Sequence, residues 1–364
     1  MLQLERYRKV SATRGQGGFT LIEMLVAMAI LLTVAGIVMS GMTQMMFVQG
    51  SVANRSEMHS SVRSVTELIE QEIGQAGKIS LPNMVTHTTA PTTPAQVTLQ
   101  TAIVSPGGCT TNCAPGTQTV TLSSVAGMFT NIQLTFVDAG ANQETVQATA
   151  IDFAGKTITA YFSNPHAVGQ PILVDGGFAT GIVPADATTV TAQGISLPTG
   201  ATTYQYGSTG YVLKLYGDVD NDGNLVYVEY TCSPGTTTAP GTLSRSVTTL
   251  PTDGSIPAKT ASAVLLDNVL TSTNAAGNTV PCFSYQEKYV SPDTYVLNVA
   301  VTLTVQTPLP DPKTHVYQQE TKALLNVAPR NVFDTWQLAS ANVPSRVQPI
   351  PPSIGGTGGL ITQP

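Results

Sequence analysis

The chain has 364 residues, of which 10% are charged, and its formal net charge is -6. Soluble domains usually contain about a quarter charged residues, so this composition favours a secreted β-rich protein over a cytosolic one. Generic binding to nucleic acid phosphates needs a basic surface, and the acidic balance of the chain disfavours that function.

The first segment of the chain is short and net positive. Residues 1–18 hold four basic side chains against one acidic one, and they end in Gly17 and Gly18. Behind them, residues 24–48 contain neither a charge nor a proline. A helix rises about 1.5 Å per residue, so this run can cross the ~30 Å hydrocarbon core of a bilayer. The pattern predicts a helix that spans a membrane over residues 19–48.

Glu23 is the unusual residue, because a carboxylate at the edge of a lipid-spanning run costs about 2.5–3.5 kcal/mol unless it has a partner. The motif Gly18-Phe19-Thr20-Leu21-Ile22-Glu23 resembles the signal of type IV prepilins and type II secretion pseudopilins. The resemblance implies that a prepilin peptidase cuts after Gly18 and that Phe19 becomes the N-methylated first residue of the mature chain. Residues 1–18 are then a leader peptide. An ordinary signal anchor with a chance glutamate is the alternative.

The resemblance also implies a role for Glu23 in assembly. Its carboxylate would face the amine of Phe19 in a neighbouring subunit, and such a buried ion pair sets axial register. Because Phe19 precedes Glu23 by four residues, we expect the two on one helical face.

An amphipathic helix follows over residues 51–77. Its apolar positions recur at helical spacing, and Pro82 ends it. The apolar set is Met58, Val62, Val65, Ile69 and Ile73. Residues 19–77 together form one stalk helix, and we expect its amphipathic half to pack on a sheet.

Short alternating segments separated by turn residues fill the rest of the chain, which predicts antiparallel strands. Residues 78–178 form a β-rich region, which includes a linker at 83–95 and an inserted module over 119–174. Residues 179–342 form a pilin-like β domain. Residues 343–364, rich in Pro and Gly, are predicted to be a flexible tail. The predicted fold class is α+β, with a long stalk helix packed on a large antiparallel β-rich region.

The order of elements after the stalk is informative. Two strands, 211–216 and 225–231, flank an acidic turn, and a long alternating strand at 297–305 precedes a last strand at 323–327. This order resembles PilW-type minor pilins and J-type pseudopilins. Many major pilins carry a proline in the membrane half of the helix. Its absence here and the large soluble region favour a minor component.

The acidic turn is also a candidate calcium site. Asp218, Asp220, Asp222, Gly223 and Glu229 satisfy the D-x-D-x-D-G-x5-E calcium-loop pattern, and Asn224 lies within it. Hard oxygen ligands at alternate positions suit Ca²⁺. The flanks are strands and not helices, so Glu229 is the weakest member, and a solvated turn without metal is the alternative.

Four cysteines, Cys109, Cys113, Cys232 and Cys282, allow three pairings. The simplest is Cys109 with Cys113 and Cys232 with Cys282, which an oxidising periplasm or cell surface permits. Zinc is the rival reading.

The sequence holds no G-x-S-x-G elbow, no H-E-x-x-H and no phosphate-binding loop, so we predict that the protein is not an enzyme. We expect His166 to be a turn residue and Trp336 to be a packing anchor.

The sequence therefore predicts a minor pilin of a type IV pilus, PilW-like, incorporated in a tip or priming complex. Expected partners are the prepilin peptidase, other major and minor pilins or pseudopilins, and the inner-membrane assembly platform. Before assembly it would cross the inner membrane once, and afterwards it would lie in the periplasm or at the cell surface. A minor pseudopilin of type II secretion and a pilus-borne adhesin are the alternatives.

Overall fold

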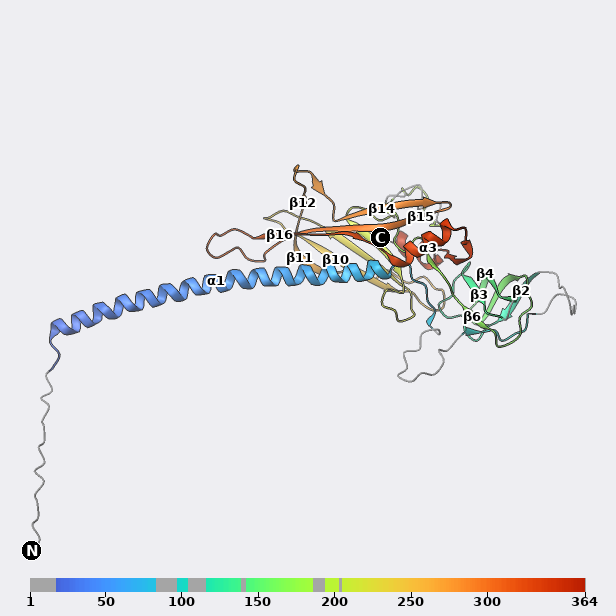
Figure 1. Ribbon diagram of the computed structural model, residues 1–364, viewed down its shortest axis with the longest axis horizontal. Helices are drawn as coiled ribbons and strands as arrows, with labels where there is room; N and C mark the ends of the chain where they lie inside the picture. Colours follow the sequence, from blue (N-terminus) through green and yellow to red (C-terminus); the bar gives the residue numbers. More distant parts are fainter. Residues whose placement is uncertain are drawn as a thin grey trace, which may run out of the picture.

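The computed structural model describes residues 18–82, 97–103, 116–138, 142–185, 194–202 and 205–363. The predicted leader up to residue 17, the linker at 83–95, and Cys109 and Cys113 lie outside this part of the chain. Figure 1 shows one long helix, half of it free, whose other half lies along a β-rich body. The predicted fold class, α+β with a large antiparallel region, is confirmed.

Helix α1, Leu21–Gln75, is built as two halves with different surfaces. The apolar side chains from Leu21 to Val48 are exposed, whereas the positions predicted to form the apolar stripe of the second half are buried. The helix ends at Gln75 with Ala76 as its C-cap, and Gly77 follows with φ at +82°, where an added Cβ would meet Val332 and Phe178. Glycine tolerates that left-handed conformation without a Cβ penalty.

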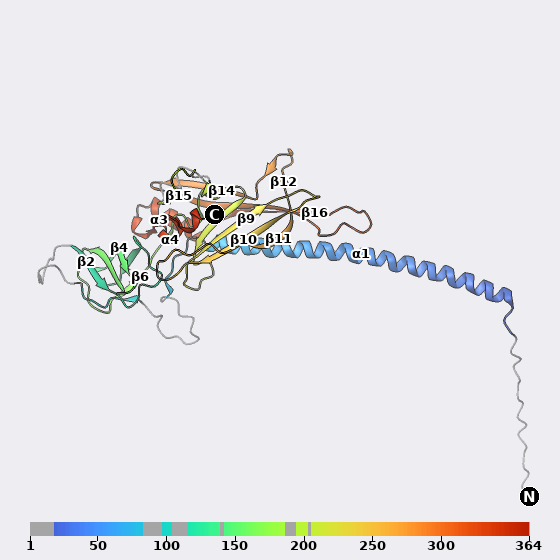
Figure 2. The ribbon, with the colours of Figure 1, turned by 180° about the vertical axis from the view of Figure 1, so that it is seen from behind.

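A seven-stranded antiparallel sheet carries the second half of α1 on one face. Its order is β14-β15-β11-β10-β9-β8, and β16 also pairs with β15. The strands are β8 (Val212–Gly217), β9 (Val226–Ser233), β10 (Gly241–Thr249), β11 (Ala263–Leu270), β14 (Phe283–Val290), β15 (Asp293–Gln306) and β16 (Gln319–Val327). The apolar stripe of α1 joins one core cluster with inward-facing residues of these strands. Figure 2 shows the same layering from behind.

A second sheet lies between α1 and β8 in sequence. Its order is β1-β6-β3-β4-β5-β2, and every pairing in it is antiparallel. The strands are β1 (Val97–Thr98), β2 (Gly116–Thr121), β3 (Gln133–Phe136), β4 (Glu144–Asp152), β5 (Thr157–Phe162) and β6 (Pro171–Leu173). A bridge from Leu99 to Leu122 links the two outer strands and closes the sheet into a small barrel. The barrel lies at the end of the body away from the free half of α1 (Figure 1).

Short elements complete the body. They are β7 (Gly177–Phe178), the β12 (Ser272–Thr273) and β13 (Thr279–Val280) hairpin, α3 (Arg330–Ser340), η4 (Pro344–Arg346), β17 (Val347–Gln348), α4 (Pro352–Gly355) and η5 (Leu360–Thr362). Trp336 of α3 stacks near Phe333, with ring centroids 5.3 Å apart, and packs beside buried Val332.

The prediction of a flexible tail at 343–364 is wrong. Strand β17 pairs with β7 in parallel, and Ile354, Leu360 and Ile361 are at most 1% exposed. These side chains belong to the same core cluster as the barrel. A segment rich in Pro and Gly with almost no charge also suits a buried irregular segment, because fixed proline backbone loses little entropy on folding.

Candidate functional site

The first turn of α1 holds the residues that the sequence singled out. Thr20 is the N-cap, and its hydroxyl accepts a hydrogen bond from the backbone N–H of Glu23 at 3.3 Å. The Glu23 carboxylate accepts from the Thr20 backbone N–H and from its hydroxyl, both at 2.9 Å through Oε2. We did not predict this reciprocal capping box from the sequence, although the spacing T-x-x-E is its sequence signature.

Phe19 does not belong to the helix, contrary to the expectation that it shares a face with Glu23. It precedes the N-cap, is 86% exposed, and lies with Gly18 outside any helix or strand. The bond between Gly18 and Phe19 therefore lies in a non-helical, exposed stretch.

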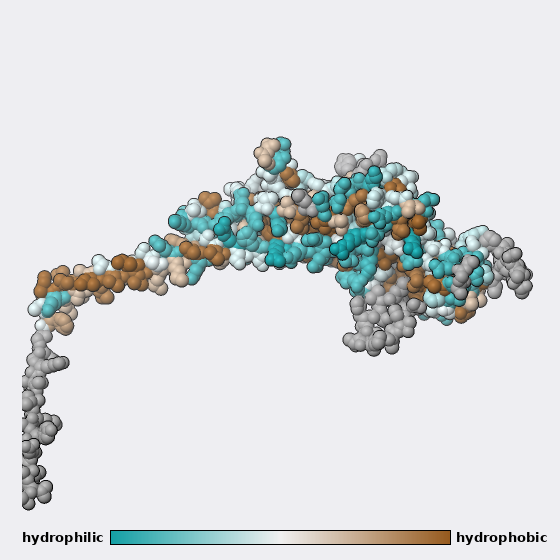
Figure 3. Space-filling view, viewed as in Figure 1, coloured by the Kyte–Doolittle hydropathy of each residue, from teal (hydrophilic) through white to brown (hydrophobic). Residues whose placement is uncertain are grey.

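The free half of α1 is an apolar rod. It is the one helix in the described part of the chain that is long and apolar enough to cross a membrane, and that apolar window is wholly exposed. Figure 3 shows this surface as a hydrophobic band that gives way to polar surface along the body. Exposed apolar area of this extent marks an interaction with lipid or with other protein.

The acidic turn brings three of the predicted calcium ligands together. One carboxylate oxygen from each of Asp218, Asp220 and Asp222 can be chosen so that all lie within 4.8 Å of one another. Asp218 is fully buried, accepts from the backbone N–H of Asp222 at 3.0 Å, and pairs with Lys78 Nζ at 3.2 Å. Asn224 donates to Asp222 through its side-chain and backbone N–H, which lowers the pKa of that carboxyl. Lys78 thus supplies part of the positive charge that the sequence assigned to a metal.

Glu229 lies apart from this cluster, so its predicted place in the calcium set is not met. On strand β9 it accepts from Lys259 Nζ at 2.9 Å and from the Tyr227 hydroxyl at 2.8 Å. The calcium-loop pattern presumes a helix after the turn, and in a strand the twelfth position points elsewhere.

The disulfide between Cys232 and Cys282 is present, and both cysteines are buried. It ties strand β9 to the residue that precedes β14, across a sequence separation of 50. One half of the simplest predicted pairing is therefore found. The other half lies outside the residues described.

His166 is more than a turn residue. Its side chain is fully buried, with Nδ1 3.2 Å from Asp138 Oδ2 and Nε2 2.9 Å from Glu144 Oε1. Glu144 also accepts from the backbone N–H groups of Ser163 and Asn164. The histidine therefore links the β3–β4 hairpin to the loop after β5. The sequence offered no signal for this contact, because the two carboxylates lie 28 and 22 residues away.

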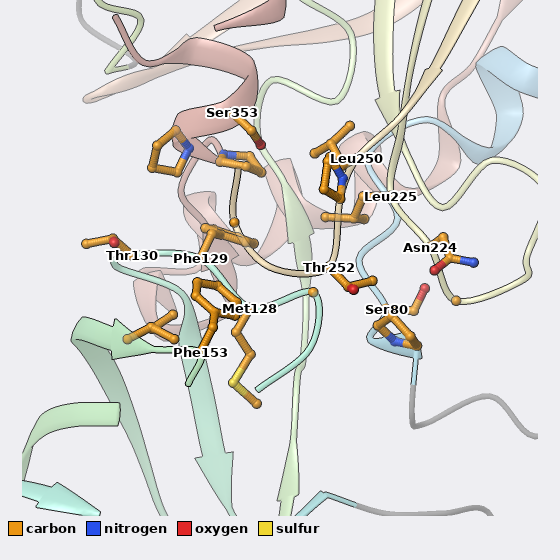
Figure 4. Close-up of a pocket in the computed structure, with 18 residues that line it drawn as sticks. Ser80, Met128, Phe129, Thr130, Phe153, Asn224, Leu225, Leu250, Thr252 and Ser353 are labelled. Atoms are coloured by element: carbon orange, nitrogen blue, oxygen red, sulfur yellow. The ribbon is translucent and has the colours of Figure 1, made fainter. Parts of the chain in front are cut away.

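A cavity of about 120 Å³ lies where the barrel meets the larger sheet. Figure 4 shows Met128, Phe129 and Phe153 on its barrel side, with Leu225 and Leu250 across from them. Ligand pockets usually measure about 300–1,000 Å³, so this cavity suits a few waters better than a substrate. Among the described residues that line it, none is a histidine or a cysteine and none carries a carboxylate.

Comparison with known families points to the helix start. The family model described as the prokaryotic N-terminal methylation motif matches residues 13–39, a range that includes Gly18, Phe19 and Glu23. No curated protein and no solved structure matches the chain. The motif and the exposed apolar helix together support a membrane-anchored protein of the type IV pilin or pseudopilin kind.

Proposed function

We propose that this protein is a minor pilin of a type IV pilus, PilW-like, which is cut by a prepilin peptidase, N-methylated at Phe19 and assembled through α1. The observation that carries the proposal is the methylation motif at the start of an exposed apolar helix. Partners would be the peptidase, other pilins and the inner-membrane assembly platform. The protein would cross the inner membrane once and then move to the periplasm or cell surface within the filament.

In this function the apolar helix moves from the lipid into a bundle of other pilin helices, and no reaction on a substrate is involved. Side chains from Leu21 to Val48 that face lipid in the membrane would face equally apolar helices in a filament. Transfer between two apolar surroundings changes the hydrophobic free energy little, so specific packing and polar pairs decide the register.

Glu23 is suited to set that register. Within its own chain it uses one carboxylate oxygen, Oε2, for both donors from Thr20. Among the described residues Oε1 has no hydrogen-bond partner, so it is available to the methylated amine of an adjacent subunit. When the two charges pair, neither group is left as an uncompensated charge in apolar surroundings.

A place at the tip or in a priming complex is supported by the size of the body. Two sheets and a packed tail stand on one helix, and the helix lacks the proline found in many major pilins. A J-type pseudopilin of type II secretion would share these features. Co-purification with pilus or with secretion components separates the two.

An adhesin is the second candidate, and the position of the barrel favours it. The barrel lies at the end of the body opposite the membrane-spanning half of α1, where it would face the outside (Figure 1). Piliated cells that carry the chain without residues 97–173 should then lose attachment while keeping pili. Unchanged attachment would dismiss this candidate.

Processing is tested at Gly18. Replacement by a bulky residue, Gly18→Leu, should leave the leader attached, because the peptidase needs a small residue before the cut. Mass spectrometry of the purified chain reads the N-terminus and its methylation. A normal, methylated Phe19 in the variant would refute the cleavage assignment.

The role of Glu23 is tested by three variants that separate charge from capping. Glu23→Gln keeps an N3 side chain that can complete a capping box but removes the charge. Thr20→Ala removes the capping hydroxyl and keeps the charge, whereas Glu23→Ala removes the charge and the carboxylate half of the box but leaves the Thr20 hydroxyl able to accept from the backbone N–H of residue 23. We expect Glu23→Gln and Glu23→Ala to insert in the membrane but fail to enter filaments, whereas Thr20→Ala enters them. If Glu23→Gln is incorporated normally, the ion pair does not set the register.

A further inference from the structure

A loop of the β body lies beside α1 at the point where the apolar rod ends. This 307–318 loop joins β15 to β16 and, in Figure 1, extends along α1 towards its N-terminal half. Asn54 Nδ2 donates to the Leu309 carbonyl at 3.4 Å, and Gln318 Nε2 donates to Ser51 Oγ at 3.3 Å. Pro312 lies against Gly50. The loop is therefore held at the level of residues 50–54 of the helix.

That level is the membrane surface if α1 spans the bilayer. The apolar run ends at Val48, and the contacted residues Gly50 and Ser51 lie two and three residues further on, a rise of about 3–5 Å. Headgroup layers add about 5–8 Å to each side of the hydrocarbon core. The helix therefore places the 307–318 loop at the depth of the lipid headgroups.

The surface of the loop fits such a depth. Leu309 and Val316 are each 62% exposed and Tyr317 is 38% exposed, although they belong to a soluble body. Lys313 and His315 are exposed beside them. Tyrosine is enriched at membrane interfaces, and a lysine there reaches outward to lipid phosphates while its stem covers apolar surface.

The backbone of the loop is also prepared for a poorly hydrated site. Positions 308, 310 and 312 are prolines, which have no N–H to leave unpaired. Asp311 Oδ1 accepts from the backbone N–H groups of Lys313 and Thr314, both at 2.9 Å. The Thr314 backbone N–H and the Ser51 hydroxyl lower the pKa of Asp311 to about 2, so the carboxylate stays ionised and keeps this turn formed. Polar groups that bond within the loop cost less when water is excluded.

We propose that the 307–318 loop is a lipid-contacting foot, which inserts Leu309, Val316 and Tyr317 into the headgroup region and sets the body upright on the membrane before assembly. The inference rests on the proposed membrane anchoring of α1. The expected partner of the foot is a lipid surface, because the foot continues the apolar surface of the spanning helix at the same end of the body.

Quenching of tryptophan by nitroxide lipids tests the foot. The sole tryptophan is first removed as Trp336→Phe, and one new tryptophan is placed in the full chain as Val316→Trp. Val168→Trp is the matched control, because Val168 is 58% exposed and lies in the loop between β5 and β6 of the distal barrel. Phe47→Trp reports on the helix itself. Vesicles of phosphatidylethanolamine and phosphatidylglycerol carry the nitroxide either near the headgroup or deep in the chains.

We expect the headgroup nitroxide to quench most of the Val316→Trp fluorescence and little of the Val168→Trp fluorescence. A cooperative thermal unfolding transition of each variant, followed by circular dichroism, shows that the body is folded. If Phe47→Trp is quenched and Val316→Trp is quenched no more than Val168→Trp, the foot does not touch lipid and the proposal fails, which would leave the loop as a surface for a neighbouring subunit. If Phe47→Trp is not quenched by either lipid, the membrane anchor itself fails, and the foot with it.

Discussion

A partly buried ion pair contributes to the attachment of the stalk to the sheet, beside the apolar stripe of α1. Glu72 of α1 contacts Arg245 of β10 and accepts from the Tyr230 hydroxyl of β9, and its own side chain is only 9% exposed. Arg245→Met would leave the Glu72 carboxylate buried with a single neutral donor. Removing one partner of a fully buried pair costs about 3–5 kcal/mol. Because Arg245 is a quarter exposed and Tyr230 remains, we expect a loss of about 2–3 kcal/mol.

The assay is thermal unfolding of the full chain in detergent, followed by circular dichroism. For a body of this size about 1 kcal/mol corresponds to ~2–4 °C, so the melting temperature should fall by roughly 5–10 °C. Glu72→Leu combined with Arg245→Met should recover most of that loss, because no buried charge is left.

An exposed pair on the same helix is the matched control. Arg63 bonds Glu67 one turn away, and its side chain is 79% exposed. Arg63→Met should not shift the melting temperature measurably, since surface pairs contribute little. Equal shifts in melting temperature for Arg63→Met and Arg245→Met would refute the reasoning. So would a Glu72→Leu and Arg245→Met double variant whose loss equals the sum of the two single losses.

Three further predictions concern the body. Burial raises the pKa of Asp293 to about 6, so the folded protein holds that proton more tightly than the unfolded chain; stability should be highest below about pH 4 and decline as the pH rises to about 6. Asp293→Asn should remove this decline, a gain of up to about 3 kcal/mol at pH 7 and almost none at pH 4, and an equal gain at both pH values would contradict it. Ile354→Ala should cost about 2–5 kcal/mol of unfolding free energy in denaturant titrations, because the side chain is fully buried, whereas a loosely attached tail would tolerate it. Millimolar Ca²⁺ should raise the melting temperature, an effect that the double variant Asp220→Asn and Asp222→Asn should lose; no shift in the native chain would mean that Lys78 alone balances the turn.

The helix shows how far local patterns reach. The apolar run, the stripe from Met58 to Ile73 and the break near Gly77 all follow from periodicity and from the conformational freedom of single residues, and each is found where it was predicted. The strands follow from alternation in the same way. The start of the helix was misplaced by a few residues, because Thr20 takes the N-cap and leaves Phe19 outside.

The tail shows where local patterns stop. A Pro- and Gly-rich segment without charge has the same local pattern whether it is solvated or buried. Only packing against the barrel and against strands β8 and β9 decides that Ile354 and Leu360 enter the core. Glu229 is a similar case, because Lys259 and Tyr227 engage its carboxylate on a strand and draw it away from the acidic turn.

By itself, then, the sequence determined the anchor: a leader motif, an uncharged span and one acid at its edge are properties of consecutive residues facing lipid or water. Tertiary structure alone decided which distant side chains meet. The contact of Glu72 with Arg245 bridges 173 residues, and that of Asn54 with Leu309 bridges 255. Such pairs depend on how whole elements pack, and no periodicity within either segment carries that information.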